Sequence, residues 1–382
     1  MIDFTLTDEQ IALQNMARKF AKNEILPIAA KCDHEAQYPV ELIQKAHNVG
    51  LLNLSIPVEY GGIGLGILDQ CIIMEEIGSA CTGIGTIIVA SDLGIVPIEL
   101  AGSDEQKRRF LEPMTKKCSL AAFALTEPGA GSDAASISTT CRKEGDKYIL
   151  NGTKQFISNA RVADLITVFA TKDKTLKHRG LCAFVVEKGT PGMTIGKDED
   201  KLGQRAAPTN EITFEECAIP EENLLGNEGD GFKIALNTLD RTRIPIGAMA
   251  VGLARSAMEY SIDYASKRVQ FKQPIINFQA IQWKIAEMAK NIELARLIVY
   301  RAAWSFDRGL NEIKISSMAK AFATDIALQS AIEAVQIFGG YGYTKEYPVE
   351  KLMRDAKLLQ IYEGTNEIQH LVIAKEVIKE RS

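Results

Sequence analysis

The runs Leu165-Ile-Thr-Val-Phe-Ala170 and Leu181-Cys-Ala-Phe-Val-Val186 decide the fold class, because they are rich in the β-branched and aromatic residues that favour strands. Similar short runs surround them: Leu120–Leu125, Lys147–Leu150, Met193–Ile195 and Ile212–Phe214. Glu144-Gly145-Asp146, between two strand-like stretches, is typical of a hairpin turn. Strands spaced this closely, with no helix between them, predict an antiparallel β-barrel or sandwich.

Helical periodicity replaces this pattern on both sides. Thr7 and Gln10 have the spacing of a capping box, and Ser103 has the position of an N-cap. After Gly231 the apolar residues return to a helical period, and small residues between Gly247 and Ala254 would let helices approach closely. The sequence therefore predicts an α+β protein with three domains. They are an N-terminal helical domain (1–118), a middle antiparallel β-barrel domain (119–228) and a C-terminal four-helix bundle domain (229–382).

The composition is typical of a globular chain of two or three domains: 382 residues, 46% hydrophobic, 24% charged, net charge −5. No block of Lys or Arg stands out, so nucleic acid is not an expected partner. The seven cysteines and four histidines are scattered, which predicts neither disulfides nor a metal site. Met1–Phe4 lacks the features of a targeting segment, and the weakly charged run Ile77–Ile98 is a poor membrane span. We therefore expect a cytoplasmic protein without membrane insertion.

Three stretches carry residues that suit chemistry. Thr126–Asp133 is a loop whose glycines and hydroxyl groups could bind phosphate, although a plain connector is the simpler interpretation. Gly339–Tyr343 ends a helix and needs no further role. Ile361–Glu367 places Glu363 between bulky neighbours and a glycine, where burial would raise its pKa and make it a base near neutrality. A solvated loop glutamate is the alternative.

Taken together, ordered stretches along the whole chain resemble the acyl-CoA dehydrogenases, most closely the short- and medium-chain branch. The matching stretches are Ala124–Asp133, Leu150–Lys154, Phe214–Pro220, Glu221–Gly226, Gln336–Gly342, Tyr347–Lys357 and Ile361–Thr365. Their order and spacing are far more specific than any single motif. The helical, β and helical regions described above also agree with the layout of that family.

The resemblance implies α,β-desaturation of an acyl-CoA thioester, with FAD as the hydride acceptor. Glu363 would remove the α-proton, and the β-hydrogen would leave as hydride to flavin N5. In the family, the flavin ribityl 2′-hydroxyl and the backbone N–H of this glutamate hold the thioester oxygen and stabilise the developing enolate. Thr242 lies near the place where other branches carry the base, and it is not acidic, which supports Glu363.

The resemblance also implies binding residues, position by position. For FAD they are Thr126, Ser132, Phe156 (Trp in many relatives), Ser158 (Thr in many relatives), Arg268, Phe271, Gln279, Gln336, Gly340, Thr365 and Glu367. For the acyl-CoA they are Ile88, Ser132, Asp240, Arg243 and Gly364. Several of these residues reach the FAD of a neighbouring subunit in the family, so a homotetramer is expected. An electron-transferring flavoprotein is the expected electron acceptor.

Asp92 departs from the family pattern, which usually has Ser or Thr at the matching place on a helix that lines the acyl pocket. A helix-end cap beside Ser91 and Gly94 is one interpretation. The other is a second base facing the substrate, which would suit an alicyclic dehydrogenase acting on cyclohexane- or cyclohexene-carboxyl-CoA and forming a cyclic diene. An acyl-CoA oxidase, recognised by oxygen reactivity, and a non-catalytic CoA-binding protein, recognised by lack of FAD, are further alternatives.

Overall fold

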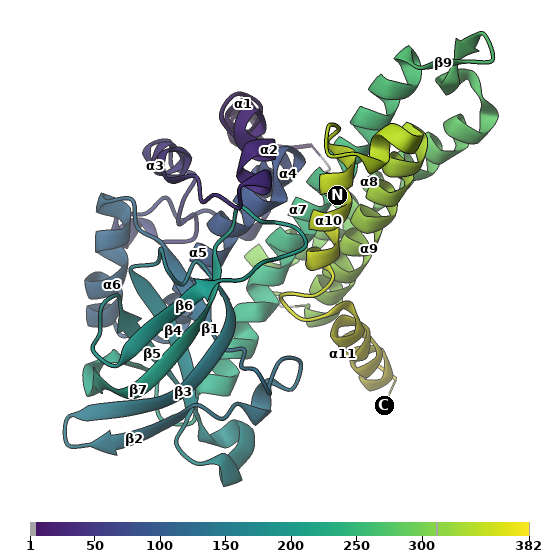
Figure 1. The fold of residues 1–382 in the computed structure, drawn as a ribbon. Helices are drawn as coiled ribbons and strands as arrows, with labels where there is room; N and C mark the ends of the chain where they lie inside the picture. Colours follow the sequence, from purple (N-terminus) through teal and green to yellow (C-terminus); the bar gives the residue numbers. More distant parts are fainter. Residues whose placement is uncertain (1–4, 311, 382) are drawn as a thin grey trace.

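The computed structural model describes residues 5–310 and 312–381 (Figure 1). Residues 1–4, on which the expectation of no targeting segment rests, lie outside the described residues. The first region is helical, as expected. Its α-helices are α1 (Asp8–Phe20), α2 (Leu26–His34), α3 (Val40–Asn48), α4 (Ile67–Ala80), α5 (Thr82–Ala101) and α6 (Asp104–Lys116).

Both predicted helix starts are confirmed. The Thr7 hydroxyl accepts from the Gln10 N–H at 3.2 Å, and the Gln10 side chain accepts from the Thr7 N–H at 3.1 Å. Ser103 and Gln106 form the same reciprocal pair at the start of α6. These side chains satisfy N–H groups that the first turn of a helix leaves without backbone partners.

Helix α5 runs through the interior of the molecule. Its length and composition would allow it to cross a membrane, but 78% of its most apolar window is buried inside the structure. It packs against α7 and against the first strand of the middle domain. These contacts are those of a core helix in a globular protein.

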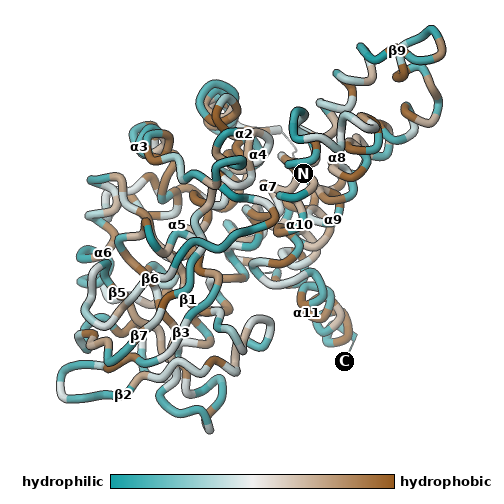
Figure 2. Tube along the Cα trace, in the orientation of Figure 1, coloured by the Kyte–Doolittle hydropathy of each residue, from teal (hydrophilic) through white to brown (hydrophobic). Residues whose placement is uncertain are grey.

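The middle region is a sheet, and the predicted strands are present. The strands are β1 (Ala121–Ala124), β2 (Thr140–Glu144), β3 (Lys147–Ser158), β4 (Leu165–Thr171), β5 (Leu181–Glu187), β6 (Met193–Asp198), β7 (Thr209–Pro220) and β8 (Leu224–Leu225). The predicted hairpin joins β2 to β3, with Glu144 opposite Lys147 and Gly145 at a φ of 61°. This turn is hydrophilic (Figure 2).

The expected antiparallel barrel is corrected in two respects. The strand order is β6-β7-β3-β2-β4-β5-β8, and among the described residues no pairing joins β6 to β8, so the sheet does not close. Moreover, β1 pairs with β4 in parallel, and Thr140 of β2 meets Thr171 of β4 in parallel. Hydrophobic alternation along a strand shows which face is buried, but it does not show which strand lies alongside.

The last region is helical and begins with a helix of 37 residues. Its helices are α7 (Gly231–Lys267), α8 (Gln279–Asp307), α9 (Ile313–Phe338), α10 (Val349–Leu359) and α11 (Asn366–Lys379). The short hairpin of β9 (Val269–Gln270) and β10 (Gln273–Pro274) lies at the end far from the large sheet (Figure 1). In the described part of this region, α7, α8 and α9 pack on one another, α10 packs on both α9 and α7, and α11 packs on α9. The C-terminal region is therefore helical, as expected.

The predicted close helix contact is also present. A Cβ atom on Gly252 of α7 would lie 2.0 Å from the backbone oxygen of Glu75 in α4. A side chain at this position would therefore push the two helices apart. This contact joins the N-terminal and C-terminal helical regions around one core.

Candidate active site

The turn between α10 and α11 carries Glu363. Glu363 and Gly364 have positive φ angles of 56° and 89°. The Thr365 hydroxyl then caps α11 by accepting from the Ile368 N–H at 3.4 Å. A left-handed conformation is unfavourable for a residue with a side chain, and such strain gathers at functional sites. Tertiary contacts must therefore hold Glu363 in this conformation.

The Glu363 carboxyl lies against α7. Its Oε2 is 2.9 Å from the Thr242 hydroxyl oxygen, which also lies 3.0 Å from the backbone oxygen of Thr238. The single hydroxyl proton of Thr242 can therefore be donated either to Glu363 or to Thr238. Burial raises the pKa of Glu363 to about 7, while the Thr242 bond and the charges of Arg243 and Lys320 oppose the rise. Among the described residues, the backbone N–H of Glu363 donates no hydrogen bond. A carboxyl that titrates near neutrality thus lies beside a free donor.

Two buried cations, Lys320 and Arg243, hold this turn in place through hydrogen bonds, Lys320 directly and Arg243 through Gln369. The Lys320 ammonium donates to the Gly364 backbone oxygen at 2.8 Å. Arg243 is 6% exposed and donates to Gln369 at 3.0 Å, and the Gln369 amide donates to the same Gly364 oxygen at 3.0 Å. Asp240 forms an ion pair with Arg243 at 2.8 Å. The contacts of Asp240, Arg243 and Gly364 with CoA stay predictions, whereas the supporting roles of Lys320 and Gln369 were missed.

Tyr362 extends the site toward α5. Its hydroxyl lies 3.2 Å from the Thr86 hydroxyl, which donates to the Gln204 side chain at 2.6 Å. Ile88, predicted to line the acyl pocket, is buried on the same helix. Sequence reasoning missed Gln204 because it belongs to a loop with a left-handed φ of 50°, which approaches α5 only in the folded chain.

Asp92 lies in the middle of α5, because the helix continues to Ala101. The helix-end cap interpretation is therefore wrong. Asp92 instead accepts from the backbone N–H and hydroxyl of Ser55 at 3.2 and 3.0 Å. Burial, followed by the charge of Glu99, raises its pKa to about 7 against the opposing Ser55 bonds. In the described residues, Asp92 and Glu363 share no hydrogen-bonding partner.

A buried ion pair anchors the loop Thr126–Asp133. Lys154 of β3 and Glu127 are 2.8 Å apart, with side chains 0% and 2% exposed. The loop tip is open, since a Cβ atom on Gly129 or Gly131 would have no neighbour within 4 Å. Ser132 is exposed at this tip. An open, anchored glycine loop fits the phosphate-binding role that the resemblance implies.

Phe156 stands next to this loop. Its ring is exposed, at 62%, and its φ is 59°, a conformation in which the strand pairing of β3 shifts register. The preceding Gln155 N–H donates to the backbone oxygen of Thr126 at 2.9 Å, which joins the loop to the strand. Ser158 is half-buried nearby on β3. An exposed aromatic ring beside a hydroxyl and a glycine loop fits the flavin that the resemblance implies.

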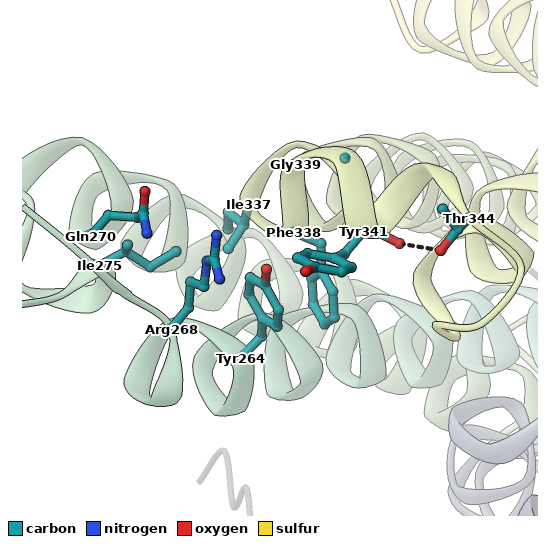
Figure 3. Close-up of a pocket in the computed structure, with 10 residues that line it drawn as sticks. Tyr264, Arg268, Gln270, Ile275, Ile337, Phe338, Gly339, Tyr341 and Thr344 are labelled. Atoms are coloured by element: carbon teal, nitrogen blue, oxygen red, sulfur yellow. Dashed lines mark hydrogen bonds between the residues drawn. The ribbon is translucent and has the colours of Figure 1, made fainter.

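The other predicted FAD residues lie elsewhere. A cavity of about 440 Å³ at the end of α7 and α9 is lined by Arg268, Gly340 and neighbouring residues (Figure 3). Tyr264 stacks on Phe338 in its wall, with ring centroids 4.1 Å apart. Further predicted residues near this end are exposed: Phe271, Gln279 and Gln336. Thr365 and Glu367 lie at the start of α11, beside the Glu363 turn.

The cysteines behave as the sequence indicated. All seven are free thiols, and six of them are buried. In the part of the chain that the structure describes, no group of three or more His, Cys, Asp or Glu residues is placed to hold a metal ion.

Comparison with known proteins supplies the family context. Models of the N-terminal, middle and C-terminal domains of acyl-CoA dehydrogenase match residues 7–117, 122–217 and 229–378. An acyl-CoA dehydrogenase of Bacillus subtilis (strain 168) is 46% identical over 374 residues, which cover 98% of this chain and 99% of that protein.

Solved structures agree over the full length. Butyryl-CoA dehydrogenase from Megasphaera elsdenii has a TM-score of 0.96 and 41% identity, covering 99% of this chain and 100% of that chain. A chain from a structure described as the electron transferring flavoprotein of Acidaminococcus fermentans has a TM-score of 0.96 and 43% identity, covering 98% and 99%. The alicyclic alternative built on Asp92 is not favoured by these relatives.

Proposed function

Because the chain belongs to the acyl-CoA dehydrogenase family, we propose that Glu363 is the base that removes the α-proton of its acyl-CoA thioester. The chain is an FAD-dependent oxidoreductase acting on CH–CH bonds. The observation that carries the proposal is the Glu363 carboxyl, whose pKa burial raises to about 7, beside its own unpaired backbone N–H. A base with a pKa near the working pH combines ionisation with proton affinity.

The groups around the Glu363 carboxyl have separate roles in the proposed proton abstraction. Thr242 holds one carboxyl oxygen, so the other is free to take the proton. The free N–H of Glu363 would donate to the thioester oxygen, where negative charge develops as the proton leaves. FAD, when bound, supplies the acceptor for the β-hydrogen as hydride. Exclusion of water by the bound acyl group would strengthen both interactions.

We infer a short acyl chain as the substrate. The support is the full-length similarity to a protein named butyryl-CoA dehydrogenase. Ile88 and the network of Tyr362, Thr86 and Gln204 form the protein interior next to the base on the α5 side. Initial rates of flavin reduction should therefore be highest with butyryl-CoA and lower with octanoyl-CoA.

We further propose that FAD is shared between copies of this chain. One group of predicted contacts lies on the middle domain: Thr126, Ser132, Phe156 and Ser158. A second group lies at the far end of the long helices (Figure 1): Arg268, Phe271, Gln279, Gln336 and Gly340. Since the two groups lie at opposite ends of one chain, a second copy would complete each site. This arrangement supports the predicted homotetramer.

Two further proposals concern the setting of the enzyme. The similarity to a chain from a structure described as an electron transferring flavoprotein supports such a protein as the electron acceptor. The seven free thiols fit a reducing compartment, which supports a cytoplasmic location.

The test of Glu363 is the variant Glu363→Gln in the purified holoenzyme. Anaerobic mixing with butyryl-CoA should bleach the flavin at a rate about 10²–10⁴-fold below that of the wild type, because only the base is lost. The visible spectrum of bound FAD should be retained. Glu346→Gln, which changes an exposed glutamate before α10, is the matched control and should react at the wild-type rate. Full-speed bleaching by Glu363→Gln would refute the proposal.

A further inference from the structure

Lys320 of α9 is a buried lysine that has no assigned part in the proton abstraction proposed for Glu363. None of its surface is exposed. Its ammonium donates to the Gly364 backbone oxygen at 2.8 Å and to the Asn366 side-chain oxygen at 2.9 Å. Among the described residues, no carboxylate oxygen lies within 4.0 Å of the Lys320 nitrogen, so Lys320 forms no direct ion pair. Burying an ammonium without a directly paired anion is costly, so its presence here needs a reason.

Both acceptors of Lys320 belong to the turn that carries Glu363. Gly364 directly follows the base, and Asn366 begins α11. The Asn366 amide also donates to the Thr324 hydroxyl at 2.9 Å and to Asp325 at 2.7 Å, so α9 holds the start of α11 through several bonds. The Glu363 backbone is in the left-handed region, where it depends on such contacts.

We propose that Lys320 is a positioning residue for the base: its ammonium fixes the Glu363–Gly364 turn on α9 and places a positive charge beside the Glu363 carboxyl. The inference deepens the proposed function and rests on it for its kinetic consequences. Lys320 touches neither the thioester nor the cofactor in this scheme. It acts only through the turn and through its charge.

Among the surrounding charges, Glu363 is the anion that most strongly stabilises the protonated form of Lys320. The charged groups facing this region are Asp240 and Arg243 on α7, Lys320 and Asp325 on α9, and Glu367 on α11. Burial lowers the pKa of Lys320 to about 7, and the charge of Glu363 is the strongest influence opposing this change. In return, the Lys320 charge opposes the rise in the pKa of Glu363. Each ionised group therefore stabilises the other.

A purely mechanical role for Lys320 predicts something different. If only the hydrogen bonds mattered, any loss of a bond between α9 and the start of α11 would disturb the base equally. If the charge matters, only a neutral residue at 320 would favour the protonated Glu363 carboxyl. A direct titration of Glu363 separates these two cases.

The experiment uses the holoenzyme with Lys320→Met, and with Lys320→Gln as a second neutral variant that keeps a donor. Thr324→Val is the matched control, because it removes a bond to Asn366 without removing a charge. Infrared spectroscopy follows the C=O band of the protonated carboxyl, assigned to Glu363 by its absence in Glu363→Gln. The pH midpoint of this band reports the base with no substrate present.

We expect the midpoint to rise by about one pH unit in both neutral variants, because an opposite charge has been removed. Thr324→Val should keep the wild-type midpoint. With butyryl-CoA, the rate of flavin reduction by the neutral variants should fall about fivefold at pH 7, because the ionised fraction drops from about one half to about a tenth. At pH 9 the rates should agree within about 20%.

An unchanged midpoint in a folded neutral variant would overturn the inference, as would an equal shift in Thr324→Val. Failure of the proposed function is a separate observation. In that case Glu363→Gln would reduce its flavin with butyryl-CoA at the wild-type rate, while the infrared midpoint would still test Lys320.

Discussion

Replacing Lys154 by methionine should strongly destabilise the middle domain. Lys154 and Glu127 are 2.8 Å apart, and their side chains are 0% and 2% exposed, so the variant leaves a carboxylate buried without its cation. Glu127 retains other donors, from Ser138 at 2.8 Å and from the Thr139 N–H at 2.9 Å. These bonds limit the damage but do not replace a charge.

The pKa of Glu127 gives the expected magnitude. Burial opposes its ionisation, but the charge and hydrogen bond of Lys154, with the bonds from Thr139 and Ser138, hold the pKa at about 2 instead of the usual 4.5. A difference of about 2.5 units corresponds to about 3 kcal/mol. This stability is present above about pH 4.5 and is lost as the pH falls through 2. Breaking a buried pair typically costs about 3–5 kcal/mol, so we expect a loss of about 3 kcal/mol at pH 7.

The measurement is urea unfolding at pH 7 and pH 4.5, with hydrogen exchange of β3 to locate the change. In Lys154→Met the pKa of Glu127 should rise, so that protonation relieves the defect and the difference from the wild type shrinks at pH 4.5. The double variant Glu127→Gln/Lys154→Met should recover part of the loss. A loss below about 0.5 kcal/mol at pH 7, or an equal loss at both pH values, would refute the reasoning.

Three other variants test the remaining parts of the structure. Thr242→Val removes a hydrogen bond to the Glu363 carboxylate and should move the pH midpoint of flavin reduction upward by about one unit, whereas Thr238→Val, one turn away, should leave it unchanged. Asp92→Asn should stabilise the protein by up to about 4 kcal/mol above pH 7 in urea unfolding, because burial raises the pKa of Asp92 from 3.8 to about 7. The gain in stability should vanish near pH 4, and a loss of stability at pH 8 would contradict this expectation. Arg268→Gln should weaken FAD retention by the oligomer about tenfold in equilibrium dialysis, and equal retention would exclude Arg268 from the cofactor site.

The domain order and the candidate base could be predicted from the sequence. Periodicity changes between helical and strand-like stretches gave the three regions, and the caps at Thr7 and Ser103 marked helix starts that the structure contains. The setting of Glu363 between a bulky residue and a glycine left a base and a solvated glutamate both open; the resemblance favoured the base, and burial raises the pKa of this carboxyl to about 7. These features depend on neighbours within a few residues, which a sequence displays directly.

Contacts between distant segments could not be predicted in the same way. The parallel pairing of β1 with β4 and the open order of the sheet depend on which strands meet in space. A helix-end cap was one of two interpretations of Asp92, but α5 continues past it and Ser55 becomes its partner. The sequence identifies a carboxyl group but does not show which distant residues contact it in the folded chain.

The amino-acid sequence by itself determined where most helices and strands form, since local patterns encode them, and its resemblance to a known family singled out Glu363 as the proposed base. Only the tertiary structure decided how the Glu363 turn is held. Lys320, Arg243 and Gln369 come from different helices and meet beneath one turn. The free energy of a buried charge depends on what surrounds it in three dimensions, and packing alone sets those surroundings.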